Sequence, residues 1–440
     1  MLGACARFTP LPLPATPHAA PGLAQLNHAG IDISRPLSLA AISALALRNA
    51  PQIRATIATH RLAWARYKAA GVLPNPQFSG AFLPLLAGFG TTPGYNYVIT
   101  EDIRALVTYH ARNRGARDQA YQVDAELLWQ AWQVVATARA LAVNIVADEN
   151  ALALRQSQAE LQNALYAATR AAVAQGNLTA LDLAPVRDAA QQTTAQIAAQ
   201  RAALQSSRLA LNALLGLAPS AALTLEPTLQ PPPVDPAAIR AAIPDIANRR
   251  PDLIALRLGY AAENQALRVA ILSQFPPFAL GAQGNSDNAN VRNLGPQINV
   301  DIPMFDLNQG GVAIARATRR QLRDAYGLRL DSAGQEISAA LITLRRQGAR
   351  LATLRATLPP LLRDKAHAGA AFAAGTLTLP EYANLALAAL ARQQEILAEQ
   401  AALSQTCITL ATLTGADLPQ IRLTAHDRLR SLATQTVSAP

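Results

Sequence analysis

The chain of 440 residues is duplicated, and this limits its fold more than any other feature. Anchors in the first half return 199 or 200 residues later, and the shift of one residue falls between two predicted strands, where insertions are best tolerated. The pairs 200 residues apart are Pro51 and Pro251, Pro76 and Pro276, and Phe78 and Phe278. The pairs 199 residues apart are Asp102 and Asp301, Gly176 and Gly375, and Gly216 and Gly415. One half therefore repeats the fold of the other.

Each half is predicted to contain a helix, a β-hairpin, a very long helix and a final helix. In the first half the pattern predicts helices at 37–72, 111–175 and 180–215, and strands at 77–84 and 95–103. In the second half it predicts helices at 251–273, from 311 to 374 and up to 415, and strands at 278–284 and 297–302 separated by the loop SDNANVRN. Five segments follow: an N-terminal tether (1–36), a first repeat (37–217, hairpin 77–103), a proline-rich connector (218–250), a second repeat (251–417, hairpin 278–305) and a C-terminal tail (418–440).

The last predicted strand alternates strictly between apolar and polar side chains. Ile298, Val300 and Ile302 share one face, and Gln297, Asn299 and Asp301 share the other. A soluble sandwich and a membrane barrel both contain such strands. Two hairpins supply only four strands, which do not close a barrel, so closure requires several copies around an axis. Three copies would supply 12 strands, within the range of outer-membrane barrels.

The helical parts are predicted to form a coiled coil. Two helices of about 36 residues, placed end to end, nearly match the long helix of about 65 residues beside them. Leucine and isoleucine recur at heptad spacing in both halves, at Ile197, Leu204 and Leu211 and again at Ile396, Leu403 and Leu410.

Composition excludes several classes of protein. The net charge of +10 comes from basic residues scattered along the helices without interleaved aromatic residues, so we expect no nucleic-acid partner. The sequence has no run of 18 apolar residues that would predict a transmembrane helix. The six histidines never fall at metal-ligand spacing, and no nucleophile or phosphate-binding motif is present, so we expect neither an enzyme nor a cofactor.

The N-terminus begins Met-Leu-Gly-Ala-Cys, which is similar to the lipobox of a bacterial lipoprotein. Only Met1 and Leu2 precede Gly3, whereas an export signal needs a charged and an apolar region. One hypothesis is that the start is truncated and that Cys5 carries a lipid anchor. The alternative is a chance cysteine near the terminus.

Four motifs, in this order, resemble the TolC-like outer-membrane efflux proteins. They are Leu73-Pro-Asn-Pro76, Leu211-Asn-Ala-Leu-Leu-Gly216, Arg249-Arg-Pro-Asp-Leu253 and Pro303-Met-Phe-Asp-Leu-Asn-Gln-Gly310. Phe305-Asp306-x-Asn308-x-Gly310 and Leu127-Leu-Trp-Gln-x-Trp132 are most similar to the heavy-metal branch of CzcC- and CusC-type proteins. Many members of that branch are lipoproteins, which favours a lipid on Cys5.

The resemblance implies a mainly α fold with a small β part. Three copies would join an α-helical barrel to a 12-stranded transmembrane β-barrel, with four strands from each protomer. It also implies an outer-membrane exit duct in a Gram-negative bacterium, with its helices in the periplasm. The implied partners are an adaptor protein and an inner-membrane pump of the RND type, and the cargo would be heavy-metal cations or small toxic molecules.

The resemblance further places an adaptor contact and a gate at the two glycine breaks. The contact residues would be Gly176, Asn177, Leu178 and Thr179, and Gly375, Thr376, Leu377 and Thr378. Asp182 and Glu381 would form acidic rings at the gate, with Phe372 beside them. Alternatively, both acids merely stabilise a helix N-terminus.

Two alternatives to the efflux duct remain open: an exit duct for type I secretion, and a coiled-coil structural protein with no transport role. The second does not account for two amphipathic hairpins at matching positions in the repeats.

Overall fold

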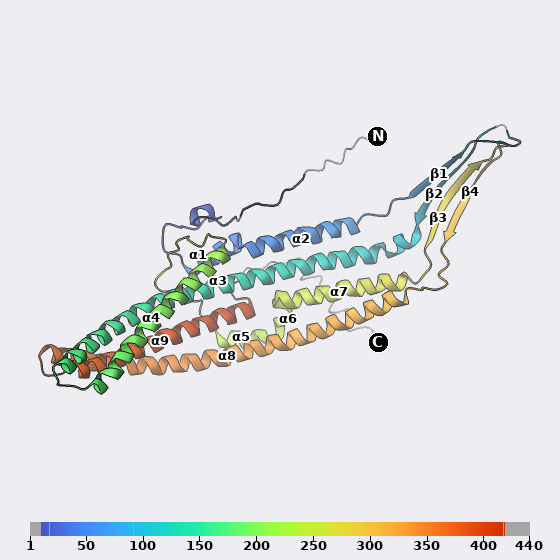
Figure 1. Ribbon diagram of the computed structural model, residues 1–440. Coiled ribbons are helices and arrows are strands. Elements are labelled where there is room, and N and C mark those ends of the chain that lie inside the picture. The colour runs from blue at the N-terminus through green and yellow to red at the C-terminus, as the bar shows by residue number, and fades with distance from the viewer. Residues whose placement is uncertain (1–9, 17, 91, 417, 419–440) are drawn as a thin grey trace. The chain divides into compact units, whose positions relative to one another are not determined.

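The computed structural model describes residues 10–16, 18–90, 92–416 and 418, and these residues form long helices and one small sheet (Figure 1). Cys5 lies outside the described residues. The longer helices are α1 (Leu39–Asn49), α2 (Pro51–Ala70), α3 (Ile103–Ala174), α4 (Ala180–Leu215), α7 (Pro251–Leu272), α8 (Gln309–Ala373) and α9 (Leu379–Thr414). The connector and the N-terminal segment contain the short elements η1 (Leu23–Gln25), α5 (Pro236–Ala242), η2 (Ile243–Asp245) and α6 (Ile246–Arg249). The mainly α fold with a small β part is confirmed.

The predicted helix at 37–72 is wrong in one respect, because the chain leaves the helical conformation at Ala50. Its ψ of 125° is not helical, and Pro51 begins α2. Proline disfavours a helical conformation in the residue before it, which divides the predicted helix into α1 and α2. The same break separates α6 from α7, where Arg250 has a ψ of 123° and precedes Pro251.

The long helix α3 begins at Ile103, eight residues before the predicted start at 111. The carboxylate of Asp102 accepts a hydrogen bond from Ala105 N at 3.1 Å. It therefore caps the first turn of the helix. The helix therefore follows strand β2 without a connecting loop.

Four antiparallel strands form a single sheet in the order β1-β2-β3-β4. They are β1 (Gln77–Leu83), β2 (Gly94–Asp102), β3 (Phe278–Ser286) and β4 (Arg292–Val300). The two predicted hairpins are confirmed, and they pair with each other through β2 and β3. The predicted ends of β3 and β4 are wrong. The loop is only Asp287–Val291, because both strands extend into it, and β4 ends at Val300, before the predicted end at Ile302.

Glycines end the helices at matching places in the two repeats. Gly176, Gly216, Gly375 and Gly415 have φ between 72° and 79°, in the left-handed region. At Gly176 the following amide, Asn177 N, donates to Ala172 O at 2.9 Å, and at Gly375 Thr376 N donates to Ala371 O at 3.0 Å. Both turns are Schellman motifs, which favour glycine at this position.

The chain forms two compact units, and each combines segments of both repeats. Unit 1 comprises residues 1–53, 134–233 and 342–409, and unit 2 comprises residues 54–133, 234–341 and 410–440. Helices α3 and α8 contribute residues to both units. Among the described residues, no helix has the length and apolar character needed to cross a membrane.

Unit 2 contains the sheet and the helices that lead to it (Figure 1). Helix α2 packs on α3, where His60 Nδ1 lies 2.6 Å from Asp124 Oδ1 and the Trp64 ring meets the Tyr121 ring edge-on. Buried residues from α3 and α7 form one core cluster, and Leu267, Val312 and Ala315 join α7 to α8.

In unit 1, helices pack along the predicted heptad stripes. Leu204 and Leu211 are buried, and Ile396 packs with Leu351 and Leu354 of α8. The N-terminal segment, predicted as a tether, is attached here. Ala20 N donates to Gly216 O at 2.9 Å.

Candidate functional site

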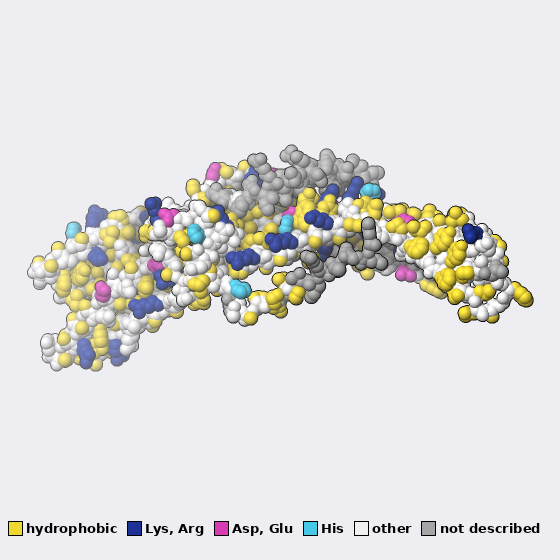
Figure 2. Space-filling model, turned by 90° about the horizontal axis from the view of Figure 1, so that it is seen from above, with side chains coloured by type: hydrophobic (Ala, Val, Ile, Leu, Met, Phe, Trp, Pro, Cys, Tyr) yellow, Lys and Arg dark blue, Asp and Glu magenta, His cyan; other side chains and the backbone are white. Residues whose placement is uncertain are grey.

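One face of the sheet is apolar and aromatic. The direct pairs between strands place seventeen residues on this face, and most of the side chains in the middle are large and exposed. Phe78 is 73% exposed, Ile99 50% and Leu294 79%. Hydrophobic side chains cover this end of the molecule in Figure 2, with few charged ones among them. The residues of this face are Phe78, Gly80, Phe82, Tyr95, Tyr97, Ile99, Glu101, Phe278, Leu280, Ala282, Gly284, Ser286, Arg292, Leu294, Pro296, Ile298 and Val300.

The opposite face is polar. Its amides and hydroxyls are Gln77, Ser79, Asn96, Thr100, Gln283, Asn285, Asn293, Gln297 and Asn299. A sheet whose large apolar side chains meet the surroundings, and whose other face hydrogen-bonds, suits lipid on one side and water on the other. This separation confirms the alternation predicted for the last strand, although Asp301 and Ile302 lie beyond the end of β4.

The first predicted contact turn, Gly176-Asn177-Leu178-Thr179, joins α3 to α4, and all four residues are exposed. Thr179 and Asp182 form a capping box at the start of α4. The Thr179 hydroxyl and amide donate to Asp182 Oδ2 at 2.7 and 2.9 Å, and Asp182 N donates to Thr179 Oγ1 at 3.3 Å. The helix start is thereby satisfied by its own side chains.

The second turn, Gly375-Thr376-Leu377-Thr378, joins α8 to α9 with similar geometry. The Thr378 hydroxyl and amide donate to Glu381 Oε2 at 2.6 and 2.9 Å. The hydrogen bond from the threonine hydroxyl, followed by that from the backbone amide, lowers the pKa of Asp182 and likewise that of Glu381 below their ordinary values. Both carboxylates are exposed and charged at neutral pH.

Phe372 lies one turn before Gly375 and stacks on Tyr382 of α9. Their ring centroids are 5.4 Å apart and the rings are nearly parallel, at 8°. The stack holds the last turn of α8 against the first turn of α9. Sequence reasoning missed Tyr382. In the first repeat, the positions 199 residues earlier are Val173 and Leu183, so only the second tip has the aromatic pair.

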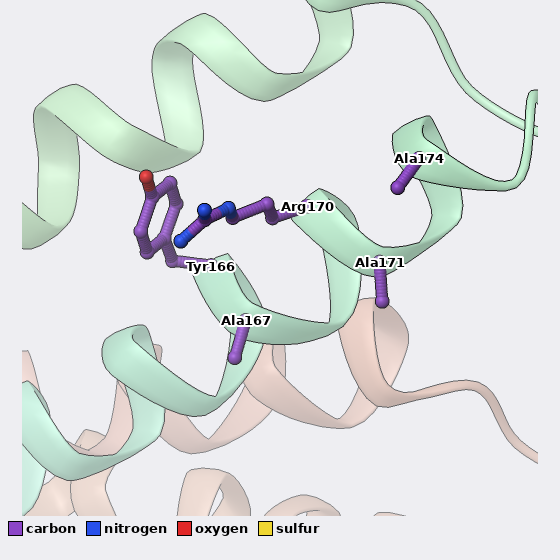
Figure 3. A pocket seen from close by; sticks show the side chains of 5 residues that line it. All are labelled: Tyr166, Ala167, Arg170, Ala171 and Ala174. Carbon is purple, nitrogen blue, oxygen red and sulfur yellow. The ribbon is translucent and has the colours of Figure 1, made fainter.

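A depression near the first tip is lined by one face of α3 (Figure 3). The Tyr166 ring and the Arg170 guanidinium lie beside each other on the side towards α4. Ala167, Ala171 and Ala174 present methyl groups along the exposed helix face. Small residues at spacings of three and four leave room for the side chains of another helix. The sequence analysis did not single out this face.

No cluster of three or more histidine, cysteine, aspartate or glutamate side chains is placed to hold a metal ion within the part of the chain that the structure describes.

Comparison with solved structures identifies the type of fold. The outer-membrane channel OprN aligns with a TM-score of 0.69 at 16% identity, covering 94% of this chain and 100% of that chain. CusC, which forms a transmembrane channel, aligns with a TM-score of 0.65 at 19% identity, covering 86% of this chain and 92% of that chain. The chain has the fold of an outer-membrane channel.

The outer membrane protein VceC from Vibrio cholerae shares this channel fold, with a TM-score of 0.68 at 16% identity over 87% of this chain and 97% of that chain. The sequence matches no protein-family model and no curated protein. The sheet belongs to unit 2, and the two tip turns belong to unit 1.

Proposed function

We propose that three copies of this chain form an outer-membrane channel that serves as a passive exit duct. The observation that supports it best is the sheet, which has an exposed apolar face, a hydrogen-bonding face and two edge strands. Unpaired strand edges are unstable in a membrane, so they need a partner or closure.

The strand order allows closure by identical copies. Because β1 to β4 alternate in direction, β4 of one copy is antiparallel to β1 of the next copy when the copies are related by rotation. Three copies of four strands give a barrel of 12 strands, an even number, as in other outer-membrane barrels. Each copy then supplies a partner strand for the edge strand of its neighbour.

The helices that adjoin the edge strands carry matching exposed faces. On α2, next to β1, small side chains and one leucine recur at spacings of three and four: Ala55, Ala58, Leu62, Ala65 and Ala69. On α8, after β4, the exposed positions with this spacing are Ile314, Ala317, Gln321, Asp324 and Leu328. Ile314 is 70% exposed and Leu328 71%. Large side chains of α8 would fill the alanine face of α2 in the next copy.

The tips are proposed to contact an adaptor protein and to form the gate. The contact residues are the two turns at 176–179 and 375–378, and the alanine face of α3 gives a helical hairpin of the adaptor a surface to pack on. Asp182 and Glu381 would form rings of negative charge at the narrowing, and Phe372 would add an apolar ring beside them. The duct performs no chemistry, and an inner-membrane pump of the RND type would supply the energy.

Assignment to the heavy-metal branch remains a proposal. It is supported by the sequence motifs, whereas CusC aligns no better than OprN or VceC. The location proposed is the outer membrane of a Gram-negative bacterium, with the helices in the periplasm and Cys5 as a lipid anchor. Cargo is either heavy-metal cations or small toxic molecules.

The function is tested by sucrose-gradient fractionation of membranes from cells that express the full gene. We expect the protein to sediment with outer-membrane porins as a trimer. Val300→Arg on the apolar face should reduce the trimer in this fraction, because the guanidinium would meet lipid near the barrel end. Asn299→Arg, one residue away on the polar face, is the matched control. It should leave the amount of trimer in the outer-membrane fraction unchanged.

Recovery of the wild-type protein in the soluble fraction would contradict the channel. The apolar face of the sheet would then require another covering, and the coiled-coil structural protein would become the better explanation.

A further inference from the structure

The polar face of the sheet is uncharged in its middle, and half of the residues there are asparagine or glutamine. Side chains that pair directly form rows across the strands, and one row is Ala81, Asn96, Asn285 and Asn293. The next is Ser79, Val98, Gln283 and Gly295, and the third is Gln77, Thr100, Gly281 and Gln297. The neutral amide face, as we name these three rows, carries no ionisable side chain on any of its twelve described residues.

The few charged residues of the strands lie elsewhere. Asp102 is on the polar face but at its helical end, where its carboxylate caps α3. Glu101 and Arg292 are on the apolar face, towards its two ends. No charged side chain of the sheet therefore lies in the middle of the polar face.

Several polar side chains of this face are open to the surroundings. Gln77, Ser79 and Asn293 are exposed, so their polar atoms are able to reach a passing molecule. An amide offers two donors and one acceptor oxygen, so it hydrogen-bonds to polar groups of either kind and carries no net charge. Such a surface can replace the hydration of hydroxyl, amide and carbonyl groups on a passing molecule.

A small metal ion gains less from this surface. Divalent cations are attracted by rings of carboxylates, and soft metals by thiolate, thioether or imidazole ligands. Amide oxygens are weaker ligands for soft metals, and the low-dielectric wall of the barrel raises the energy of ions of both signs.

We propose that the neutral amide face is the specificity-determining surface of the duct, and that it favours uncharged or zwitterionic organic cargo over metal cations. This inference rests on the proposed barrel and selects between its two classes of cargo. Charge selection, where it occurs, belongs to Asp182 and Glu381 at the tips. In the sheet, cargo is selected by hydrogen bonding.

The test is the reactivity of Gln283→Cys in the full-length protein, in cells whose outer membrane contains it. Cys407→Ala in the background removes the described native thiol. Uncharged, cationic and anionic methanethiosulfonates of similar size are applied from outside, and each rate is divided by the rate with a small free thiol. Labelling from this side does not require the gate at the tips to open.

We expect the uncharged reagent to give the highest normalised rate, and the cationic and anionic rates to agree within about threefold, because no fixed charge separates them. Adding Asn96→Asp, which lies in the neighbouring row, should raise the ratio of the cationic to the anionic labelling rate by about tenfold or more. This control shows that the assay detects a single ring of charge. Gln283→Cys combined with Asn96→Gln should behave like Gln283→Cys alone.

A cationic rate more than about tenfold above both others in the protein with neutral Asn96 would overturn the proposed selectivity. If none of the three reagents labels Gln283→Cys, this face does not line a water-filled path. The barrel itself would then be wrong, which distinguishes failure of the proposed function from failure of the inference.

Discussion

At the scale of single residues, Arg250 is a buried charge held by several partners. Its side chain is fully buried, donates to Asp252 at 3.0 and 2.7 Å and to Glu336 at 3.2 Å, and lies 4.9 Å over the Trp129 ring. Arg329 also bonds both carboxylates. Two positive and two negative side chains thus join the connector to α8. The equivalent positions of the first repeat are uncharged: Ala50, Gln52, Gln130 and Thr137.

Replacing Asp252 by Asn should destabilise unit 2 at neutral pH by about 3 kcal/mol, because it leaves the buried Arg250 without its closest acceptor charge. Unfolding of the detergent-solubilised protein by heat or urea measures this. Asp245→Asn is the matched control, because the Arg249–Asp245 pair is more than half exposed and should contribute under about 1 kcal/mol. Equal effects of the two substitutions would contradict this account.

The same group predicts how stability depends on pH. Burial raises the pKa of Asp252, but the hydrogen bonds and charges of Arg250 and Arg329 outweigh it and lower the pKa below its ordinary value. A carboxyl with a lowered pKa stabilises the fold above the unfolded-state pKa and loses that contribution as pH falls through the folded-state pKa. We therefore expect the wild type to lose stability below about pH 4, and Asp252→Asn to lose less over the same range.

At the scale of elements, the two helical tips raise a choice between capping and gating. The capping box at α4 and the Thr378–Glu381 hydrogen bonds at α9 account for the local positions of Asp182 and Glu381 without any gate. The carboxylates remain exposed and charged, however, so they are also able to act on ions. The two roles need different properties: capping needs an acceptor oxygen, whereas a gate ring needs the charge.

The double variant Asp182→Asn and Glu381→Gln separates the two roles, because an amide keeps the acceptor oxygen and removes the charge. We expect cation preference in planar bilayers to fall by roughly twofold or more if the rings face the path. Amide hydrogen exchange at the first turns of α4 and α9 should stay unchanged. Unchanged ion preference with a functional pore would assign both residues to capping alone.

In the sheet, the effect of an introduced charge should depend on its depth in the membrane. Ile99 lies in the middle row of the apolar face, with Phe78, Ala282 and Pro296, whereas Val300 lies at the helical end. Ile99→Arg should destabilise the barrel by about 2–4 kcal/mol and Val300→Arg by less, because the energy of a charge in lipid falls towards the interface. Refolding into lipid vesicles under urea measures both, with Val98→Arg on the polar face as control. Equal effects of all three would exclude a lipid-facing sheet.

At the scale of the whole molecule, assembly depends on faces that the single chain leaves exposed. A double variant with Leu62→Cys on α2 and Leu328→Cys on α8 should crosslink between copies, because the two faces would pack against each other in the ring. Denaturing gels should show covalent dimers and trimers. Leu86→Cys with Leu62→Cys is the control, because Leu86 is 93% exposed in the β1–β2 turn, away from that face. Monomers alone in the first case would contradict the proposed ring.

The sequence by itself determined the repeat and the order of its elements. The glycine ends of the helices follow from local chemistry, because Gly176 and Gly375 adopt a left-handed conformation that other residues disfavour. The alternation of apolar and polar residues likewise separates the two faces of β4. Helix α4 has the predicted bounds, and α9 ends at Thr414, just before the predicted glycine.

Only the tertiary structure decided which segments meet. The pairing of β2 with β3 joins residues 177 to 191 positions apart, and no local pattern encodes it. The same holds for the quartet around Arg250, because Glu336 is 86 residues away and its role depends on how α8 packs. Nor do the compact units follow the repeats, because each is built from both. Local rules act through neighbouring backbone atoms, whereas these contacts depend on the burial of distant side chains in a common core.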